Sequence, residues 1–295
     1  MVPHLSTANG AAVARPALSA ARGFEIIDVF AASPSRGMTM SDVARATGIN
    51  TASCHAVLTV MVERGYLLRD PVAKTYALGP MAHAAGQAAL IAQPLLARAR
   101  DAASDLNAEL ALPVMISAPV GGDVVGIVAI GDTGDQPPLL RVGERRALVP
   151  PVGAPFVTWA GDAAIAAWLD RDPSLDGDVR ETLRRAALAI RERGFEVLLR
   201  SPAAAPLASE IRAFAGDGAG FRLGPDMVLP GTIDAEQDYT VTMIAAPVFD
   251  RQGACAFNLC LGPFAGPLRG SDILGLAERL LRACVQVMHA DRAAA

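Results

Sequence analysis

The sequence predicts an α+β protein, and three observations lead to this class. Residues 37–65 hold two amphipathic stretches separated by a glycine turn, which predicts a helix, a tight turn and a second helix. Two short runs around the turn at Asp70-Pro71-Val72 follow and predict a β-hairpin. From Pro113 onward β-rich hairpins and helices occupy separate stretches, which is typical of an antiparallel sheet with helices packed on it.

The N-terminal part is predicted to contain three helices. The first begins near Leu18 and ends before the run at residues 33–37; its expected inner stripe is Ala20, Phe24, Ile27 and Phe30. The second runs from Met40 to Thr47, because Thr39 and Asp42 have the spacing of a capping box and Gly48 can adopt the left-handed backbone that ends a helix.

The third helix is capped by Asn50 or Thr51 and has two distinct faces. The inner face is expected to hold Cys54, Val57, Leu58, Met61 and Val62, and the outer face Thr51, Ala52, His55, Ala56 and Thr59. With the following hairpin this makes a winged helix-turn-helix, in which the third helix enters the major groove of DNA and the hairpin touches the flanking backbone. Small three-helix cores of this pattern also serve as protein-interaction modules.

The rest of the chain is predicted to form a connector and a second domain. A helical region begins at Pro80 and is interrupted at Pro94. Strands are expected at residues 114–120, 124–130, 139–142, 239–249 and 254–261, and helices at 162–169, 178–193 and from Ser271. The predicted organisation is a disordered tail (1–16), a winged helix-turn-helix domain (17–79), a linker helix region (80–111) and an effector-binding and oligomerisation domain (112–290).

Composition is that of an ordinary folded protein, with 52% hydrophobic and 19% charged residues in a chain of 295. The net charge is −4, but basic residues outnumber acidic ones between Met1 and Leu78, so we expect a weak positive surface there. The four cysteines make no CxxC spacing and are expected to be buried, reduced thiols. We find no secretory signal or membrane span, and therefore expect a cytoplasmic protein.

Enzymatic chemistry has little support in the sequence. There is no GxSxG elbow and no phosphate-binding loop, and the four histidines are scattered along the chain. We therefore predict no enzymatic activity, no catalytic residue, no metal site and no cofactor.

Several motifs, in one order over about 270 residues, resemble the IclR-type transcriptional regulators. They are residues 21–27 (ARGFEII), 38–48 (MTMSDVARATG), 53–58 (SCHAVL), 65–67 (GYL), 76–79 (YALG) and 245–250 (AAPVFD), with Gly253. The resemblance implies a DNA-binding regulator, assembled as a homodimer or tetramer. It also implies a C-terminal GAF-like domain that binds a small-molecule effector.

An effector site is predicted at residues 143–159, where an apolar stretch surrounds the turn at residues 150–155. The turn can present the backbone N–H groups of Val152, Gly153 and Ala154 to a carboxylate; alternatively it is only a rigid connection. The resemblance implies that this loop and a late strand line the site. The residues implicated are Leu148, Val152, Gly153, Ala154, Asp238 and Met243.

The chain departs from the family pattern at this site. Ala154-Pro155 replace a common Gly-Lys pair, and Met243 replaces a cysteine. We therefore expect the effector to be an organic acid or a more apolar compound. The segment at residues 200–238 is longer than the family needs, and its role as a lid, an interface or a loop stays open.

The predicted DNA contacts also show a departure, because Ala56 stands where the family usually has an arginine. Arginine is the commonest specific reader of guanine, so base reading falls to small polar side chains and to contacts with thymine methyl groups. The candidate DNA-binding residues are Arg22, Arg45, Asn50, Thr51, Ser53, His55, Thr59, Arg69 and Lys74. The alternative function is a ligand-binding or protein-interaction protein whose helix-turn-helix has lost specific DNA recognition.

Overall fold

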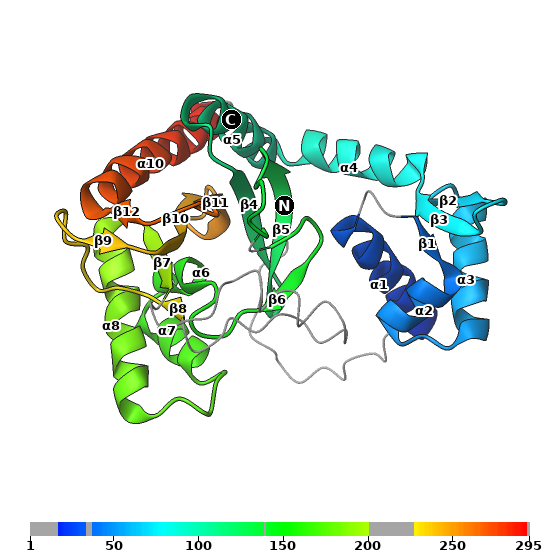
Figure 1. The fold of residues 1–295 in the computed structure, drawn as a ribbon, viewed down its shortest axis with the longest axis horizontal. Coiled ribbons are helices and arrows are strands. Elements are labelled where there is room, and N and C mark those ends of the chain that lie inside the picture. The colour runs from blue at the N-terminus through cyan, green and yellow to red at the C-terminus, as the bar shows by residue number, and fades with distance from the viewer. Residues whose placement is uncertain (1–16, 34–36, 139, 201–226, 294–295) are drawn as a thin grey trace. The chain divides into compact units, whose positions relative to one another are not determined.

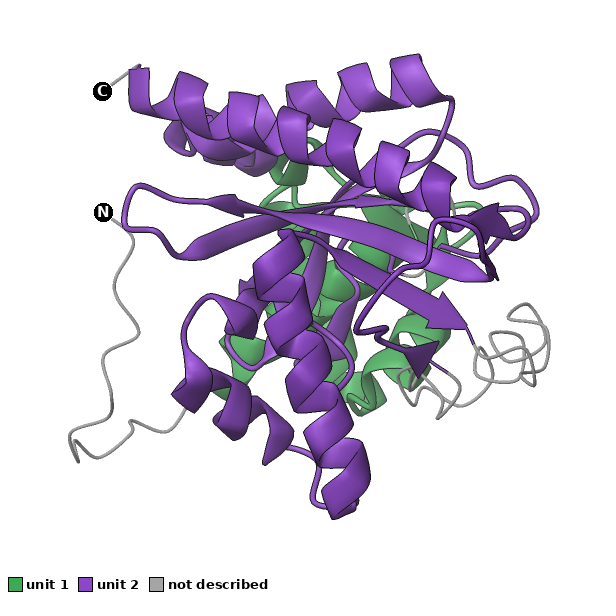
Figure 2. Ribbon diagram, turned by 90° about the vertical axis from the view of Figure 1, so that its left-hand side faces the viewer, with its two compact units in different colours: residues 1–83 green, residues 84–295 purple. Residues whose placement is uncertain are grey.

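The computed structural model describes residues 17–33, 37–138, 140–200 and 227–293. It divides into two compact units, residues 1–83 and residues 84–295 (Figure 2). Helices and antiparallel strands occur in both units, which confirms the predicted α+β class (Figure 1). The predicted tail at residues 1–16 lies outside the described residues.

The first unit is a three-helix core with a small sheet. Its elements are α1 (Leu18–Ala32), β1 (Met38–Thr39), α2 (Met40–Thr47), α3 (Thr51–Glu63), β2 (Leu67–Asp70) and β3 (Thr75–Leu78). The strands form an antiparallel sheet in the order β1-β3-β2, so the predicted hairpin is present and gains β1 as a third strand. Its buried core is Ile26, Phe30, Met38, Val43, Ile49, Cys54, Leu58, Met61, Leu67 and Tyr76.

Local signals place the ends of α2 and α3 where the sequence predicts them. The capping box is complete, since the Thr39 hydroxyl accepts a hydrogen bond from the Asp42 backbone N–H and the Thr39 N–H donates to the Asp42 carboxylate. Gly48 ends α2 with a left-handed backbone at φ 68°. Asn50, and not Thr51, caps α3.

The predicted inner stripe of α1 is partly wrong. Ile26 and Phe30 are the buried residues of this helix, whereas Phe24 is 68% exposed and Ala20 is also exposed. Both sets have helical spacing, and contacts with α2 and α3 determine which set is covered.

Two helices occupy the predicted linker region: α4 (Pro80–Ala92) begins in the first unit and continues into the second, and α5 (Pro94–Leu110) lies in the second unit. Pro94 occupies the first turn of α5, where a missing N–H costs no hydrogen bond. The later helices are α6 (Ala154–Thr158), α7 (Asp162–Leu169), α8 (Gly177–Arg193) and α10 (Gly270–Ala293). Val179, in the first turn of α8, is 44% exposed.

An antiparallel sheet of seven strands runs through this unit in the order β6-β5-β4-β11-β10-β7-β8. The strands are β4 (Val114–Val120), β5 (Asp123–Ile130), β6 (Arg145–Ala147), β7 (Glu196–Arg200), β8 (Met227–Val228), β10 (Val241–Phe249) and β11 (Cys255–Leu261). A separate pair joins β9 (Asp238–Tyr239) to β12 (Leu268–Arg269).

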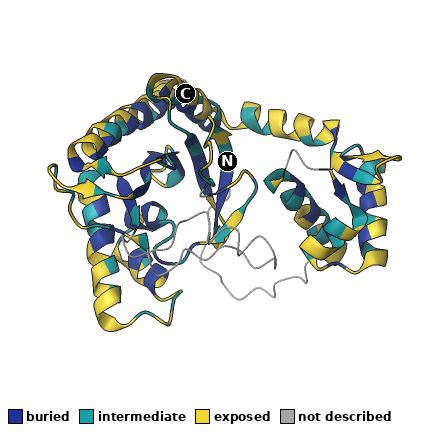
Figure 3. Ribbon diagram, viewed as in Figure 1, coloured by how far each residue is buried: buried dark blue, intermediate teal, exposed yellow. Residues whose placement is uncertain are grey.

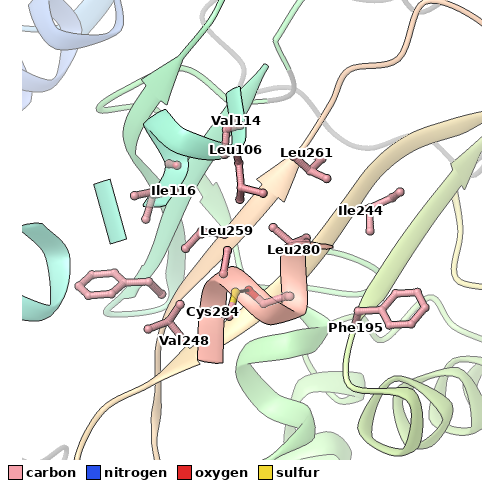
Figure 4. Close-up of a cluster of buried hydrophobic side chains, with 14 of the residues drawn as sticks. Leu106, Val114, Ile116, Phe195, Ile244, Val248, Leu259, Leu261, Leu280 and Cys284 are labelled. Atoms are coloured by element: carbon pink, nitrogen blue, oxygen red, sulfur yellow. Dashed lines mark hydrogen bonds between the residues drawn. The ribbon is translucent and has the colours of Figure 1, made fainter. Parts of the chain in front are cut away.

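Helices cover both faces of this sheet (Figure 2). On one face α5 and α10 pack against side chains such as Ile116, Ile244 and Leu259, which Figure 4 shows gathered around Leu280. On the other face α6, α7 and α8 form a second core around Trp168. Because side chains alternate along a strand, Met115, Met243 and Cys260 point toward this second face.

The predicted strand at residues 139–142 is wrong. Leu139 lies outside the described residues, and Val142 forms only an isolated bridge to Gly126. The strand at this edge is β6, three residues further on, because the turn at Gly143 (φ 81°) delays regular pairing. The strands β7 and β8 were not predicted, and the run predicted at 239–249 is interrupted between β9 and β10. Most of the long 200–238 segment, residues 201–226, lies outside the described residues.

Candidate DNA-binding surface and ligand cavity

The outer face of α3 is solvent-exposed and nearly free of charge. Thr51, Ala52, His55, Ala56 and Thr59 are all exposed, and Cys54, Leu58 and Met61 are buried beneath them (Figure 3). Ser53 is half-buried beside this face. The helix therefore presents small and polar side chains that let a backbone or base edge approach closely.

Two candidate residues on α3 already make hydrogen bonds within the helix. The Asn50 Oδ1 atom accepts from the Ser53 N–H at 2.9 Å, which makes Asn50 the cap of this helix. The Thr59 hydroxyl donates to the His55 carbonyl oxygen at 2.9 Å. Asn50 keeps its amide N–H donors for another partner, and Thr59 keeps its methyl group and hydroxyl lone pairs.

The candidate basic residues are spread over four elements of the first unit. Arg22 lies on α1, and Arg45 lies in the last turn of α2, where its Nη1 atom is 3.3 Å from an Asp42 carboxylate oxygen. Arg69 on β2 stacks over the Tyr76 ring with its Cζ atom 5.9 Å from the ring centroid. Lys74 is exposed at the hairpin turn and has φ 55°.

The hairpin turn is held by the side chain of Asp70. Its Oδ1 atom accepts from the backbone N–H groups of Val72 and Ala73 at 2.8 and 3.0 Å. These bonds lower the pKa of Asp70, so the carboxylate stays ionised and fixes the turn that carries Lys74. The tip of the hairpin is thus ordered by its own sequence.

A cavity lies on the second face of the large sheet, beneath the segment of residues 151–156. Apolar side chains from the strands and this segment form most of its wall, and the polar lining residues are Ser117, Arg146, Glu196, Asn258 and Cys260. The apolar and glycine lining residues are Met115, Val124, Leu140, Pro151, Val152, Gly153, Phe156, Leu198 and Met243. An apolar wall with few polar groups is typical of small-molecule sites.

The structure brings some of the predicted effector residues together and not others. Val152, Gly153 and Met243 line the cavity. Leu148 and Ala154 are buried next to it in the second core but do not line it. Asp238 lies elsewhere, on β9, where it pairs in register with Arg269 of β12.

Helix α7 and the turn that follows it fix the segment that covers the cavity. The indole Nε1–H of Trp168 donates to the Val152 carbonyl oxygen at 3.0 Å, and Arg171 Nη1 donates to the Leu148 carbonyl oxygen at 3.0 Å. The N–H of Val152 donates to the Val149 carbonyl oxygen at 2.7 Å. This N–H is therefore used within the turn and is not presented to a ligand, contrary to the prediction.

Gly153 is required where the covering segment approaches the sheet. Its φ is 76°, and a Cβ atom there would lie 2.1 Å from the Leu148 Cδ1 atom and 2.9 Å from the Val124 Cγ2 atom. A side chain at this position would be strained and would collide with the cavity wall.

Arg146 is a cationic group buried in the cavity wall. It reaches in from β6, its side chain is 9% exposed, and its Nη2 and Nε atoms lie 3.0 and 3.2 Å from Glu144 Oε1. Burial lowers the pKa of Arg146 and the neighbouring Glu144 opposes this shift. The ion pair allows a guanidinium to remain charged at the edge of an otherwise apolar space.

Glu196 is a buried acid that lines the same cavity from β7, toward the opposite edge of the sheet from β6. The residue is 2% exposed, and burial raises the pKa of its carboxyl group to about 8, although the charge of Arg193 opposes the shift. Its partner in register on β10 is Ala245, whose small side chain leaves the carboxyl group uncovered on that side. Glu196 is therefore mostly protonated at neutral pH.

Sequence reasoning missed both Arg146 and Glu196. Neither residue belongs to a motif, and Glu196 lies on a strand that the sequence did not predict. The only available signal was a glutamate within the apolar run at residues 195–199. An acid inside an apolar run is unusual and marks a buried polar group.

The described residues show no disulfide, metal-binding cluster or membrane-spanning helix. All four cysteines are free; Cys54, Cys260 and Cys284 are buried and Cys255 is half-buried, and burial raises the pKa of each thiol. In the described ranges no cluster of three or more His, Cys, Asp or Glu side chains could hold a metal ion. Nor does any helix there have the length and apolar character needed to cross a membrane.

Comparison with known proteins identifies the first unit. Residues 19–71 match the model of the IclR helix-turn-helix domain. This range includes α1, α2, α3 and β2, and therefore the exposed face of α3 described above. No curated protein matches the sequence.

Solved structures share the fold of nearly the whole chain. An IclR transcriptional regulator from Alicyclobacillus acidocaldarius has a TM-score of 0.66 at 18% identity, over 92% of this chain and 97% of that one. An IclR homologue from Microbacterium hydrocarbonoxydans, complexed with 4-hydroxybenzoate, has a TM-score of 0.63 at 18% identity, over 93% and 99% of the two chains. IclR from Thermotoga maritima has a TM-score of 0.56 at 17% identity, over 92% and 97%.

The sequence match and the structural likeness agree with the geometry of the two units. The first unit contains the IclR helix-turn-helix with an exposed third helix, and the described residues have the winged-helix and antiparallel-sheet architecture of the solved IclR regulators. The predicted IclR-type helix-turn-helix is confirmed for residues 19–71, and the predicted α+β fold is confirmed. Residues 19–71 therefore form an IclR helix-turn-helix domain, and the chain shares the fold of the solved IclR regulators.

Proposed function

We propose that the second unit is the effector-binding domain of this regulator and that a ligand in the sheet cavity changes operator binding by the first unit. The observation that carries the proposal is the cavity itself, which has an apolar wall and buried polar groups at Arg146 and Glu196. Such groups are costly to bury without a purpose, and a ligand that bonds them recovers the cost.

An organic acid or a more apolar compound fits this cavity best. The guanidinium of Arg146 attracts a carboxylate, and the wall of methionine, leucine and phenylalanine side chains favours an apolar body. The Microbacterium homologue is complexed with 4-hydroxybenzoate, an aromatic acid, which supports this ligand class.

On the DNA side, α3 enters the major groove. Ser53, Thr51 and His55 are positioned to bond base edges, while Ala52, Ala56 and the Thr59 methyl group suit thymine methyl groups. Arg22, Arg45, Arg69 and Lys74 contact phosphates, and Asn50 contributes its amide N–H groups at the start of the helix. No arginine reads a base from this helix, so the affinity of one half-site is modest.

A homodimer or tetramer therefore supplies the remaining affinity, because two linked copies bind two half-sites at once. Helix α4 supports an assembly of copies: it is rich in apolar residues but has no buried residue, and Ile91 is 81% exposed. We infer that this face is covered by a second copy and that the regulator works in the cytoplasm, where DNA is accessible.

The test is a mobility-shift assay of the full chain on the DNA that flanks its own coding region, at two salt concentrations and with excess non-specific competitor. A salt-sensitive complex that resists the competitor and contains an even number of copies is expected. Compounds that bind the cavity should then change the amount of this complex. A folded protein that forms no competitor-resistant complex would instead point to a chain that has lost specific DNA recognition.

Lys74 provides a sharper test of the DNA-contacting surface. Replacing Lys74 by alanine should lower the slope of log Kd against log salt by about one unit per protomer, because one phosphate contact is lost. Alanine tolerates the positive φ of this turn no worse than lysine does, so the hairpin should be unchanged. The measurement is a salt titration of operator binding by fluorescence anisotropy.

The control for Lys74 is Arg282→Ala, which removes an exposed cation from α10 in the other unit. This variant should leave the slope unchanged. A Lys74 variant that alters sequence preference at an unchanged slope would contradict the assignment of Lys74 to a phosphate.

A further inference from the structure

The carboxyl group of Glu196 has no hydrogen-bond donor among the residues that the structure describes. Its pKa is determined by burial and by the charge of Arg193, and no hydrogen bond contributes to it. Two nitrogens of Arg193 donate elsewhere: Nε donates to the Phe195 carbonyl oxygen at 2.7 Å and Nη1 to the Pro230 carbonyl oxygen at 2.9 Å. Its Nη2 atom is buried and has no hydrogen-bond partner among the described residues, Glu196 included. A buried acceptor in this situation loses its bonds to water and gains none in return.

The register of the sheet shows why the carboxyl group stays open to the cavity. Met115, Cys260, Ala245 and Glu196 occupy one row across β4, β11, β10 and β7. Ala245, the immediate neighbour, has the smallest side chain of this row, and Glu196 itself lines the cavity. The acid is thus exposed to whatever fills the cavity while it is shielded from bulk water.

The other polar lining groups already have contacts in the protein. The Asn258 Oδ1 atom accepts from the Cys255 thiol at 3.5 Å, and Arg146 is paired with Glu144. A hydrogen bond to Ser117 lowers the pKa of Cys260 against the larger effect of burial, so these two side chains also interact. Among the polar groups of the lining, Glu196 is therefore the one to which a ligand can most directly supply a missing hydrogen bond.

We propose that the effector carries a hydroxyl or amino group that donates a hydrogen bond to Glu196, which lines the same cavity as Arg146 but lies toward the opposite edge of the sheet. This inference rests on the proposed function of the cavity and adds a requirement to it. An acid without such a donor leaves the Glu196 acceptor unsatisfied, and therefore binds more weakly. Sites built to bond a ligand hydroxyl or N–H group reject the analogue that lacks it more strongly than an apolar pocket can.

The experiment compares matched probes on matched variants. Isothermal titration of the full chain, without DNA, uses 4-hydroxybenzoate, 4-aminobenzoate, benzoate and 4-methylbenzoate. The protein variants are the wild type, Glu196→Met, which keeps the size of the side chain and removes the acceptor, and Glu196→Gln, which keeps one acceptor oxygen. Glu192→Gln, on the exposed side of α8, controls for the change of charge.

On the wild type, the hydroxyl and amino probes should bind at least about tenfold more tightly than benzoate and the methyl compound, since one good hydrogen bond gives roughly this factor. In Glu196→Met this preference should disappear, in Glu196→Gln it should be partly kept, and in Glu192→Gln it should be unchanged. Comparing both ligand types on both proteins forms a thermodynamic cycle, which isolates the free energy of the hydrogen bond between the ligand donor and the Glu196 acceptor.

Equal binding of the four probes to the wild type, or a preference that survives in Glu196→Met, would overturn the inference. If none of the four binds, matched fragment pairs that differ by one hydroxyl or amine replace them, and a set with no donor-bearing binder also overturns it. Ligands that bind through Glu196 without changing the operator complex would refute the proposed regulation only. Ligands that release DNA without any preference at Glu196 would refute this inference only.

Discussion

Replacing Trp168 by alanine is expected to lower the free energy of unfolding of the second unit by about 3–5 kcal/mol, the usual cost of truncating a fully buried tryptophan. Trp168 is 1% exposed and is the largest fully buried side chain of the described residues. It fills the core between α7, α8 and the covering segment, and its indole donates to the Val152 carbonyl oxygen. The variant therefore loses both packing and the bond that holds the cavity wall.

Denaturant unfolding followed by circular dichroism measures this loss. Trp168→Phe keeps most of the packing and removes only the donor, so its loss should be near 1–2 kcal/mol. Trp159→Ala is the control, because it is the same substitution at a tryptophan that is only half-buried. The Trp159 ring contacts the Phe249 ring edge to face, with 5.4 Å between the ring centroids. If Trp168→Ala and Trp159→Ala cost the same, Trp168 has no special role in supporting the cavity.

Removing the ionisable group of Glu196 is expected to flatten the pH dependence of stability between about pH 4.5 and pH 8. The pKa is about 8 in the folded chain and 4.5 in the unfolded chain, so in this window the folded state holds a proton that the unfolded state releases. Raising the pH therefore destabilises the wild type, by about 3 kcal/mol between pH 5 and pH 8. Below pH 4.5 both states are protonated, and above pH 8 both are ionised, so the effect levels off.

Unfolding free energies of the wild type and Glu196→Gln at pH 5, 6.5 and 8 measure this effect. Glutamine stays neutral throughout, so the stability of the variant relative to the wild type should rise steadily with pH. Glu192→Gln, an exposed substitution, should follow the wild type. A constant difference between the wild type and Glu196→Gln would mean that the Glu196 carboxyl group titrates at its ordinary pKa.

The first unit could be predicted from the sequence because its signals are local. The capping box at Thr39 and Asp42, the left-handed Gly48 and the two faces of α3 each depend on residues within a few positions of one another. Hydrophobic periodicity failed on α1, where Phe24 is exposed, because two stripes had suitable spacing and only packing selects one.

The cavity was only partly predictable because its residues converge from distant strands. The sequence indicated the covering segment with Val152 and Gly153 through its proline and glycine pattern, and resemblance to the family added Met243. Glu196 and Arg146 could not be found in this way, because their roles depend on the register of β7 and on the position of β6 at the sheet edge.

The sequence by itself predicted the helix-turn-helix, the exposed face of its third helix and the hairpin, because capping, turns and helical periodicity are properties of neighbouring residues. The tertiary structure alone decided that Glu196 is buried, protonated and without a donor among the described residues. That property arises from desolvation by side chains far apart in the sequence, and no local pattern encodes it.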